Sequence, residues 1–254
     1  MSTTAFTIPS AEEVAEHVPA FERSTAIFLS GSLVAGFGHA NSDVDVYVVL
    51  STAREVEEAA AGRRATPVQD GGAVSGFYVG DVRWDMELVL APEIEKLVGR
   101  IEGAEEVDQF PLTDGEIDLL YRISVGVAIR GGDLVDAWQQ RLAASRFGDI
   151  LVSRYLEAAD GFAEDALGLL DVGDVHTAAY CARLAYELGT QAMLAHSGRY
   201  CPGSKWRIAQ LRREPAGSVT LDDYLEVVEM RDFAADGAWV ERVLGRVRGF
   251  AFEV

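Results

Sequence analysis

The first half of the chain switches between strand-like and helix-like patterns of apolar residues. Residues 42–50 alternate polar and apolar and then become continuously apolar, which predicts a central strand. Residues 25–30 form a short apolar run that predicts a buried strand. In residues 73–90 two strand-like runs flank Gly80-Asp81, a dipeptide typical of hairpin turns. Helices are predicted at about residues 10–21, 51–62 and 92–101.

From Thr113 onward the strand pattern is absent. Thr113 and Glu116 form a capping-box pattern, and helical periodicity follows to about residue 129. The remaining helices are predicted at about residues 133–146, 148–171, 174–197, 204–213, 220–231 and 236–249. The chain is therefore expected to have an α/β (α+β) domain at 1–112 and an all-helical bundle domain at 113–254.

Two aspartates open the predicted central strand. Asp43 and Asp45 are two residues apart, so in a strand they point to one side while Val44 and Val46 point into the core. Two carboxylates held this close repel each other unless a cation lies between them. Mg²⁺ prefers oxygen ligands and is bound through one or two carboxylates plus substrate phosphates. The pair therefore predicts a magnesium site.

A glycine–serine bend precedes these aspartates. Gly31 and Ser32 follow directly on the strand predicted at 25–30. Glycine allows close approach of the backbone to an anion, and N–H groups at such a turn, with the serine hydroxyl, attract phosphate. A phosphate cradle beside a carboxylate pair indicates phosphoryl transfer, in which positioning and electrostatics supply most of the catalysis.

The order of these features resembles the signature of the DNA polymerase β-like nucleotidyltransferase superfamily. That signature is an apolar strand, Gly-Ser, about ten residues, and Asp-x-Asp in an apolar strand; Gly31, Ser32, Asp43 and Asp45 match it. The resemblance implies a mixed sheet flanked by helices, two Mg²⁺ ions, ATP or another NTP as donor, and pyrophosphate as leaving group.

The resemblance also implies a third carboxylate on a neighbouring strand. Asp85 fits the apolar-x-apolar pattern best, and Glu87 lies two residues on, on the same face. Either would complete the second metal site or accept the proton of the acceptor hydroxyl. The expected catalytic residues are Asp43, Asp45, Asp85 and Glu87, with Asp43, Asp45 and Asp85 as metal ligands.

The helical half is similar to the C-terminal domains of antibiotic nucleotidyltransferases such as the aminoglycoside adenylyltransferases. The similarity lies in Tyr180-Cys181 and in residues 198–206, a loop that contains Lys205 and leads into a helix. In that family a lysine after such a loop contacts the triphosphate, so Lys205 joins Gly31 and Ser32 as a nucleotide-binding candidate. The alternative is a surface lysine beside the core residue Trp206.

Composition narrows the range of partners. The chain has 254 residues, 49% of them hydrophobic, but no run of about 20 apolar residues that would span a membrane. No secretory signal pattern and only two cysteines favour the cytoplasm. A net charge of −19 makes a long nucleic-acid substrate a poor fit and suits a cationic small molecule, although acidity can also serve solubility alone. An oligomer, such as a dimer through the helical half, is left open.

The sequence thus predicts an adenylyltransferase-like enzyme that moves AMP, or another NMP, to a hydroxyl of an antibiotic-like or other small molecule. Two alternatives stay open. One is nucleotidylation of a protein or tRNA, as in toxin–antitoxin relatives. The other is a non-catalytic module that binds nucleotide and regulates.

Overall fold

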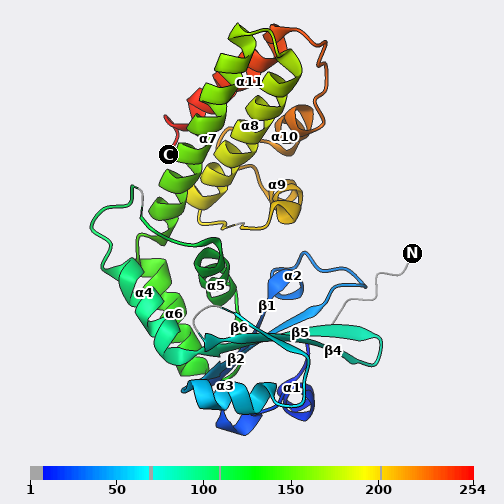
Figure 1. Ribbon diagram of the computed structural model, residues 1–254, viewed down its shortest axis with the longest axis vertical. Helices are drawn as coiled ribbons and strands as arrows, with labels where there is room; N and C mark the ends of the chain where they lie inside the picture. The colour runs from blue at the N-terminus through cyan, green and yellow to red at the C-terminus, as the bar shows by residue number, and fades with distance from the viewer. Residues whose placement is uncertain (1–7, 69–70, 109, 201) are drawn as a thin grey trace. The chain divides into compact units, whose positions relative to one another are not determined.

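The computed structural model describes residues 8–68, 71–108, 110–200 and 202–254. In this part of the chain the residues form two compact units, shown in Figure 1. The first unit comprises residues 1–103 and 113–145, and the second comprises residues 104–112 and 146–254. The predicted division at residue 112 differs from this one, since residues 113–145 belong with the sheet.

The first unit contains a mixed sheet whose strands, among the described residues, run in the order β3-β4-β5-β2-β1-β6. β2 and β5 pair in parallel, and the other neighbours pair antiparallel. The predicted mixed sheet is therefore confirmed. The strands are β1 (Ala26–Ser30), β2 (Val44–Leu50), β3 (Ala65–Pro67), β4 (Ala73–Val79), β5 (Val82–Leu90) and β6 (Val127–Arg130).

The helices of this unit cover both faces of the sheet, with α1 and α3 on one face and α5 on the other (Figure 1). Their bounds are α1 (Ala11–His17), η1 (Phe21–Arg23), α2 (Gly31–Val34), α3 (Ala53–Ala60), α4 (Ala91–Glu102), α5 (Asp114–Ser124) and α6 (Gly132–Ala144). The capping box predicted at Thr113 is present at the start of α5, and a capping box formed by Ser10 and Glu13 begins α1.

The face toward α1 and α3 carries the main core. Val44, Val46 and Val48 of β2 are fully or almost fully buried there, together with Val14 of α1 and Val56 of α3. Because successive strand residues alternate between faces, the odd-numbered residues of β2 point to the opposite face. This alternation places Asp45, the acidic residue of β2, away from the main core, as the sequence predicted.

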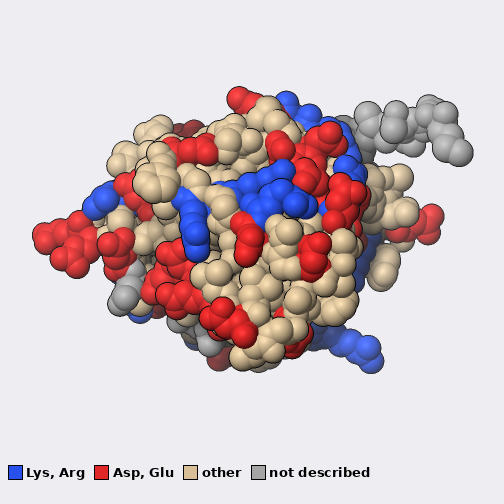
Figure 2. All heavy atoms as spheres, turned by 90° about the horizontal axis from the view of Figure 1, so that it is seen from above, with Lys and Arg blue, Asp and Glu red and all other residues tan. Residues whose placement is uncertain are grey.

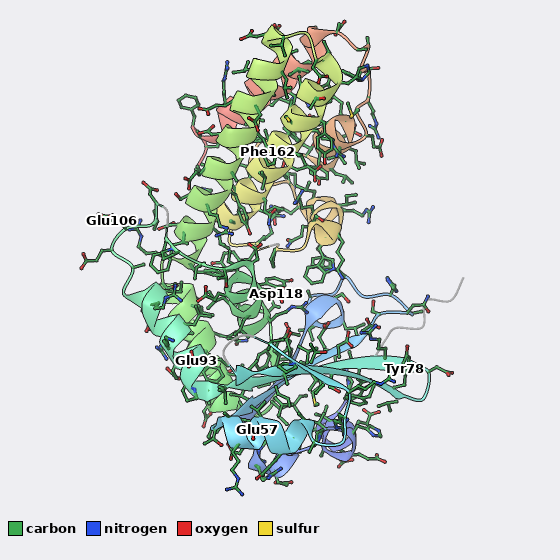
Figure 3. All side chains as sticks on the ribbon, in the orientation of Figure 1. Glu57, Tyr78, Glu93, Glu106, Asp118 and Phe162 are labelled. Carbon is green, nitrogen blue, oxygen red and sulfur yellow. The ribbon has the colours of Figure 1, made fainter. Side chains whose placement is uncertain are left out.

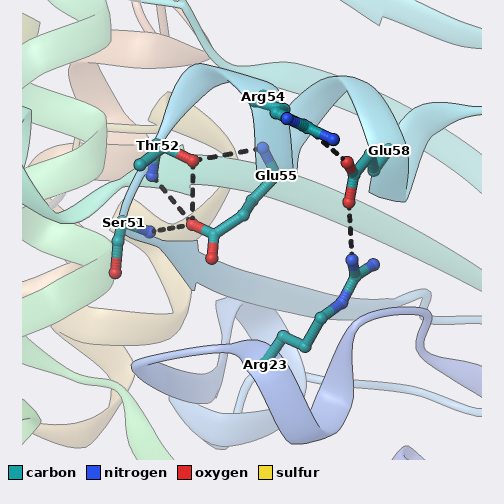
Figure 4. A network of polar contacts seen from close by, with 6 residues as sticks. All are labelled: Arg23, Ser51, Thr52, Arg54, Glu55 and Glu58. Atoms are coloured by element: carbon teal, nitrogen blue, oxygen red, sulfur yellow. Dashed lines mark hydrogen bonds and ion pairs between the residues drawn. The ribbon is translucent and has the colours of Figure 1, made fainter.

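Helix α3 is fixed to the unit by polar contacts at both ends, drawn in Figure 4. Thr52 and Glu55 form a capping box at its start. Near its end Glu58 accepts hydrogen bonds from Arg54 of the same helix (2.9 Å) and from Arg23 of η1 (2.6 Å). The Arg54 and Arg23 hydrogen bonds lower the pKa of Glu58. These contacts link α3 to the segment that leads into β1.

The prediction that strands are absent after Thr113 was wrong at one position. Helix α5 ends at Ser124, and β6 follows and pairs with β1. A Cβ at Gly126 would lie 2.8 Å from the Phe28 ring and 3.0 Å from the Arg122 carbonyl oxygen. Glycine therefore lets the chain leave the helix close to β1. The strand itself has four residues and little alternation, so its pattern merges with that of the helix before it.

The second unit is helical, as predicted. Helix α8 packs along α7 and also contacts α10 and α11. Arg207 is buried at the start of α9, where it donates hydrogen bonds to Glu187 (2.8 Å) and Gln191 (2.9 Å) of α8. The elements are α7 (Phe147–Asp171), α8 (Val175–His196), η3 (Ser204–Trp206), α9 (Arg207–Arg213), α10 (Leu221–Val228) and α11 (Gly237–Phe250).

Charge is unevenly distributed over the surface. On the face in Figure 2, Asp and Glu side chains lie in several groups, and Lys and Arg side chains gather in a band among them. Despite the net charge of −19, acidic side chains are thus not spread evenly over this face of the surface. In the described part of the chain, no helix combines the length and the apolar character needed to cross a membrane.

Candidate active site

The parallel pairing of β2 with β5 brings the predicted carboxylates together. In this register Asp45 lies opposite Asp85, and Tyr47 lies opposite Glu87. Their neighbours Val44, Val46 and Met86 are in the main core, so Asp45, Asp85 and Glu87 point to the opposite face. A one-residue shift of register would have separated them.

Asp43 directly precedes β2 and is partly buried. Its negative charge acts on the guanidinium of Arg83, the second residue of β5, which also binds Asp85. Arg83 Nη2 lies 2.9 Å from Asp85 Oδ1, and this contact raises the pKa of Arg83. The half-exposed Arg83 guanidinium is therefore paired with Asp85 and also lies within the electrostatic reach of Asp43.

The glycine–serine bend lies against Asp45. Gly31 begins α2 with φ +81°, in the left-handed region that favours glycine. A Cβ at Gly31 would lie 1.8 Å from Asp45 Oδ2 and 2.8 Å from Arg122 Nη1. The Ser30 hydroxyl donates a hydrogen bond of 2.9 Å to the carbonyl oxygen of Arg122, which fixes the bend to α5. The sequence-predicted bend and carboxylate are thus direct neighbours.

Arg122 of α5 is a residue of this site that sequence reasoning missed. Its guanidinium lies 3.4 Å from Asp45 and 3.2 Å from Asp118, and its side chain is 16% exposed. Burial lowers the pKa of Arg122, but electrostatic interactions with Tyr47, Asp118 and Asp45 raise it by more, so the net effect is an increase in the pKa. The signal in the sequence was the Asp118–Arg122 pair, at i and i+4 on a helix whose neighbouring positions are apolar.

Glu87 is a carboxylate whose pKa is affected by burial. Burial raises the pKa of Glu87, and the nearby charges of Asp118 and Asp45 add to the increase. A hydrogen bond from the Tyr47 hydroxyl and the charge of Arg122 oppose it. Tyr47 itself stacks on Phe28 of β1 with ring centroids 4.9 Å apart, which holds its hydroxyl in place.

We expect Glu87→Gln to stabilise the fold near neutral pH in the presence of EDTA. The pKa of Glu87 is higher in the folded than in the unfolded state, so ionisation costs stability as pH rises through the folded value. Glutamine keeps an acceptor for Tyr47 and carries no charge. Urea unfolding at pH 8 and pH 4 measures the effect. The gain should be present at pH 8 and smaller at pH 4, and an equal change at both would contradict the assignment.

The donor set fits magnesium chemically. Asp43, Asp45 and Asp85 offer hard carboxylate oxygens from adjacent chain segments on one face of the sheet, and Mg²⁺ needs only one or two of them beside phosphate. Within the described ranges no group of three or more His, Cys, Asp or Glu side chains is arranged to hold a metal ion. Arg122 and Arg83 supply positive charge to Asp45 and Asp85 instead. A metal would therefore bind here by exchange with guanidinium contacts.

Lys205 lies in the second unit, in η3. Its Nζ is 5.2 Å from the centroid of the Trp206 ring, and Trp206 is buried. This is the arrangement of a surface lysine beside a core tryptophan, which the sequence left as one of two alternatives. Contact of Lys205 with a triphosphate stays a prediction.

Comparison with known proteins gives little further information. No family model and none of the curated proteins matches the chain. A solved structure, described as a nucleotidyltransferase-like protein from Exiguobacterium sibiricum 255-15, aligns with 93% of this chain and 71% of that one. The TM-score is 0.45 and the identity is 14%. A similarity this distant does not assign a function.

Proposed function

We propose that this chain is a nucleotidyltransferase that moves the nucleoside monophosphate of an NTP, AMP from ATP in the first instance, to a hydroxyl of a small molecule. One observation carries the proposal: the Gly31 bend touches Asp45, which is in register with Asp85 across a parallel strand pair. Phosphate-binding backbone and paired carboxylates then lie side by side, as transfer of a nucleotidyl group requires.

The position of each residue indicates a different role in the proposed reaction. Asp43, Asp45 and Asp85 would hold Mg²⁺, which when bound supplies positive charge to the triphosphate and the attacking hydroxyl. The backbone N–H groups and the hydroxyl of the Gly31-Ser32 bend bind phosphate oxygens. Arg122, whose guanidinium lies 3.4 Å from Asp45, would pair with the triphosphate and stabilise the departing pyrophosphate.

The register supports Asp85 over Glu87 as the third carboxylate. Asp85 lies opposite Asp45, whereas Glu87 lies opposite Tyr47 and accepts a hydrogen bond from it. We therefore propose that Asp85 binds the metal and accepts the proton of the acceptor hydroxyl, and that Glu87 contacts the acceptor.

Pyrophosphate release tests the proposal. The protein is incubated with each of ATP, GTP, CTP and UTP, Mg²⁺, and a panel of hydroxyl-bearing acceptors that includes aminoglycosides and small amino alcohols. We expect release with at least one pair and complete loss in EDTA. A transferase of known activity, assayed in parallel, serves as positive control. Absence of release throughout the panel, together with no labelling of lysate proteins or tRNA by radioactive ATP, would refute nucleotidyl transfer.

One observation favours a second candidate, a nucleotide-binding module without catalysis. Asp45 and Asp85 are both in contact with arginines, whose positive charges offset those of the two carboxylates. Calorimetry distinguishes the two candidates. A catalytic site should bind ATP at least about tenfold more tightly with Mg²⁺ than in EDTA, whereas equal affinity would favour the module.

A further inference from the structure

A cavity of about 550 Å³ lies beside the candidate active site, within the first unit. It is lined by β5, α4 and α5, and Glu87 belongs to its wall. Figure 3 labels two more of its lining residues, Glu93 on α4 and Asp118 on α5. Its volume is in the range of pockets that hold small molecules.

The lining combines apolar side chains with a small number of charged ones. Val89, Leu90, Ile94, Leu97 and Leu119 supply its apolar part. Apolar lining of this kind favours a ligand with a compact apolar body, because burial of its surface is the main source of affinity. Polar groups at the wall then fix the orientation of the ligand.

The charged residues of the wall leave an excess of negative charge. Glu93 pairs with Lys96 at 3.3 Å, and Glu116 pairs with Arg100, so these four neutralise one another. Glu87 and Asp118 remain. The Arg122 guanidinium forms ion pairs with both Asp118 and Asp45, so one positive charge faces two carboxylates. Glu87 accepts a hydrogen bond from Tyr47, which is neutral.

We propose that this cavity binds the acceptor, and that the acceptor has an apolar body and a protonated amine that meets Glu87 and Asp118. The proposal rests on the proposed nucleotidyl transfer. Glu87 and Asp85 are two residues apart on one face of β5, a separation of about 7 Å. A molecule whose amine contacts Glu87 can therefore present a hydroxyl at Asp85. The substrate class is an amphipathic amino alcohol whose two groups lie at opposite ends.

Gly115 offers a way to fill the cavity without disturbing the fold. It lines the cavity from the first turn of α5, and a Cβ there would meet no heavy atom within 4 Å. Gly115→Trp places an indole at the cavity wall. Gly99 of α4 provides the matched control, because a Cβ there also meets nothing within 4 Å and Gly99 is not part of the lining. Glycine is a poor helix residue, so neither change is expected to weaken its helix.

Binding is measured in EDTA without nucleotide, by titration calorimetry with primary amines of graded size from cyclohexylamine to tryptamine. Each amine is paired with the alcohol in which a hydroxyl replaces the amine. In both the wild type and Gly99→Trp, we expect at least one amine to bind about tenfold more tightly than the alcohol paired with it. Gly115→Trp should abolish binding, and Asp118→Asn should remove the preference for the amine. No preference anywhere in the panel, or unchanged binding by Gly115→Trp, would overturn the proposal.

The two proposals fail in different ways. If the wild type releases pyrophosphate and Gly115→Trp does so at the same rate with every acceptor, the cavity does not hold the acceptor, and nucleotidyl transfer stands. If amines bind as expected but no acceptor supports pyrophosphate release and radioactive ATP labels no lysate protein or tRNA, the cavity is an amine site and the transferase proposal falls.

Discussion

Asp45→Asn is expected to reduce pyrophosphate release at least about 1000-fold, which corresponds to about 4 kcal/mol of transition-state stabilisation. Asp45 lies against the glycine bend, is in register with Asp85 of β5 and contacts Arg122. Asparagine keeps the shape and a hydrogen-bond acceptor for Arg122 but lacks the charge that a metal requires. Steady-state pyrophosphate release at saturating ATP and Mg²⁺ measures the loss.

Asp43→Ala should lose activity to a similar extent with little change in stability, since Asp43 is partly buried and lies outside the strand ladder. Asp81→Asn is the control, because Asp81 is an exposed acid in the turn between β4 and β5. It should keep the wild-type rate. If Asp45→Asn or Asp43→Ala shows near-wild-type turnover with unchanged thermal unfolding, the assignment of these two residues as metal ligands is contradicted.

The carboxylate face could be predicted from the sequence because strand periodicity alone determines it. In β2 the valines at 44, 46 and 48 alternate with Asp45 and Tyr47, so burial of the valines directs Asp45 to the other side. The pattern of β5 works in the same way for Asp85 and Glu87. The register between the two strands is a property of the folded sheet, so the sequence left the choice between those two residues open. Our proposal of Asp85 rests on its place opposite Asp45.

Arg122 could not be placed from the sequence because an amphipathic pattern does not identify what a helix packs against. The apolar positions of α5 suit a helical bundle as well as a sheet, and the sequence assigned the helix to the second domain. The structure instead packs α5 on the sheet, with Arg122 beside Asp45. The same ambiguity displaced the domain boundary, since α6 also packs on the sheet through β1 and β6.

Gly31→Ala is expected to damage both stability and activity. Alanine at φ +81° is strained, which costs about 1 kcal/mol or more. Its Cβ would also lie 1.8 Å from Asp45 Oδ2, so the carboxylate or the bend must move. Crowding of this kind adds about 1–3 kcal/mol, and we expect a total loss of about 3 kcal/mol in the free energy of unfolding. Urea denaturation followed by tryptophan fluorescence measures it.

Gly62→Ala separates the two contributions. Gly62 has a similar left-handed φ of +76°, but a Cβ there would meet no heavy atom within 4 Å. It should therefore show only the backbone cost and keep full pyrophosphate release. Gly31→Ala should release pyrophosphate at least about 100-fold more slowly even well below its unfolding temperature, because the displaced Asp45 no longer meets the bend. Equal stability and activity in the two variants would mean that the contact between Gly31 and Asp45 has no role, and the phosphate-binding assignment of the bend would be lost with it.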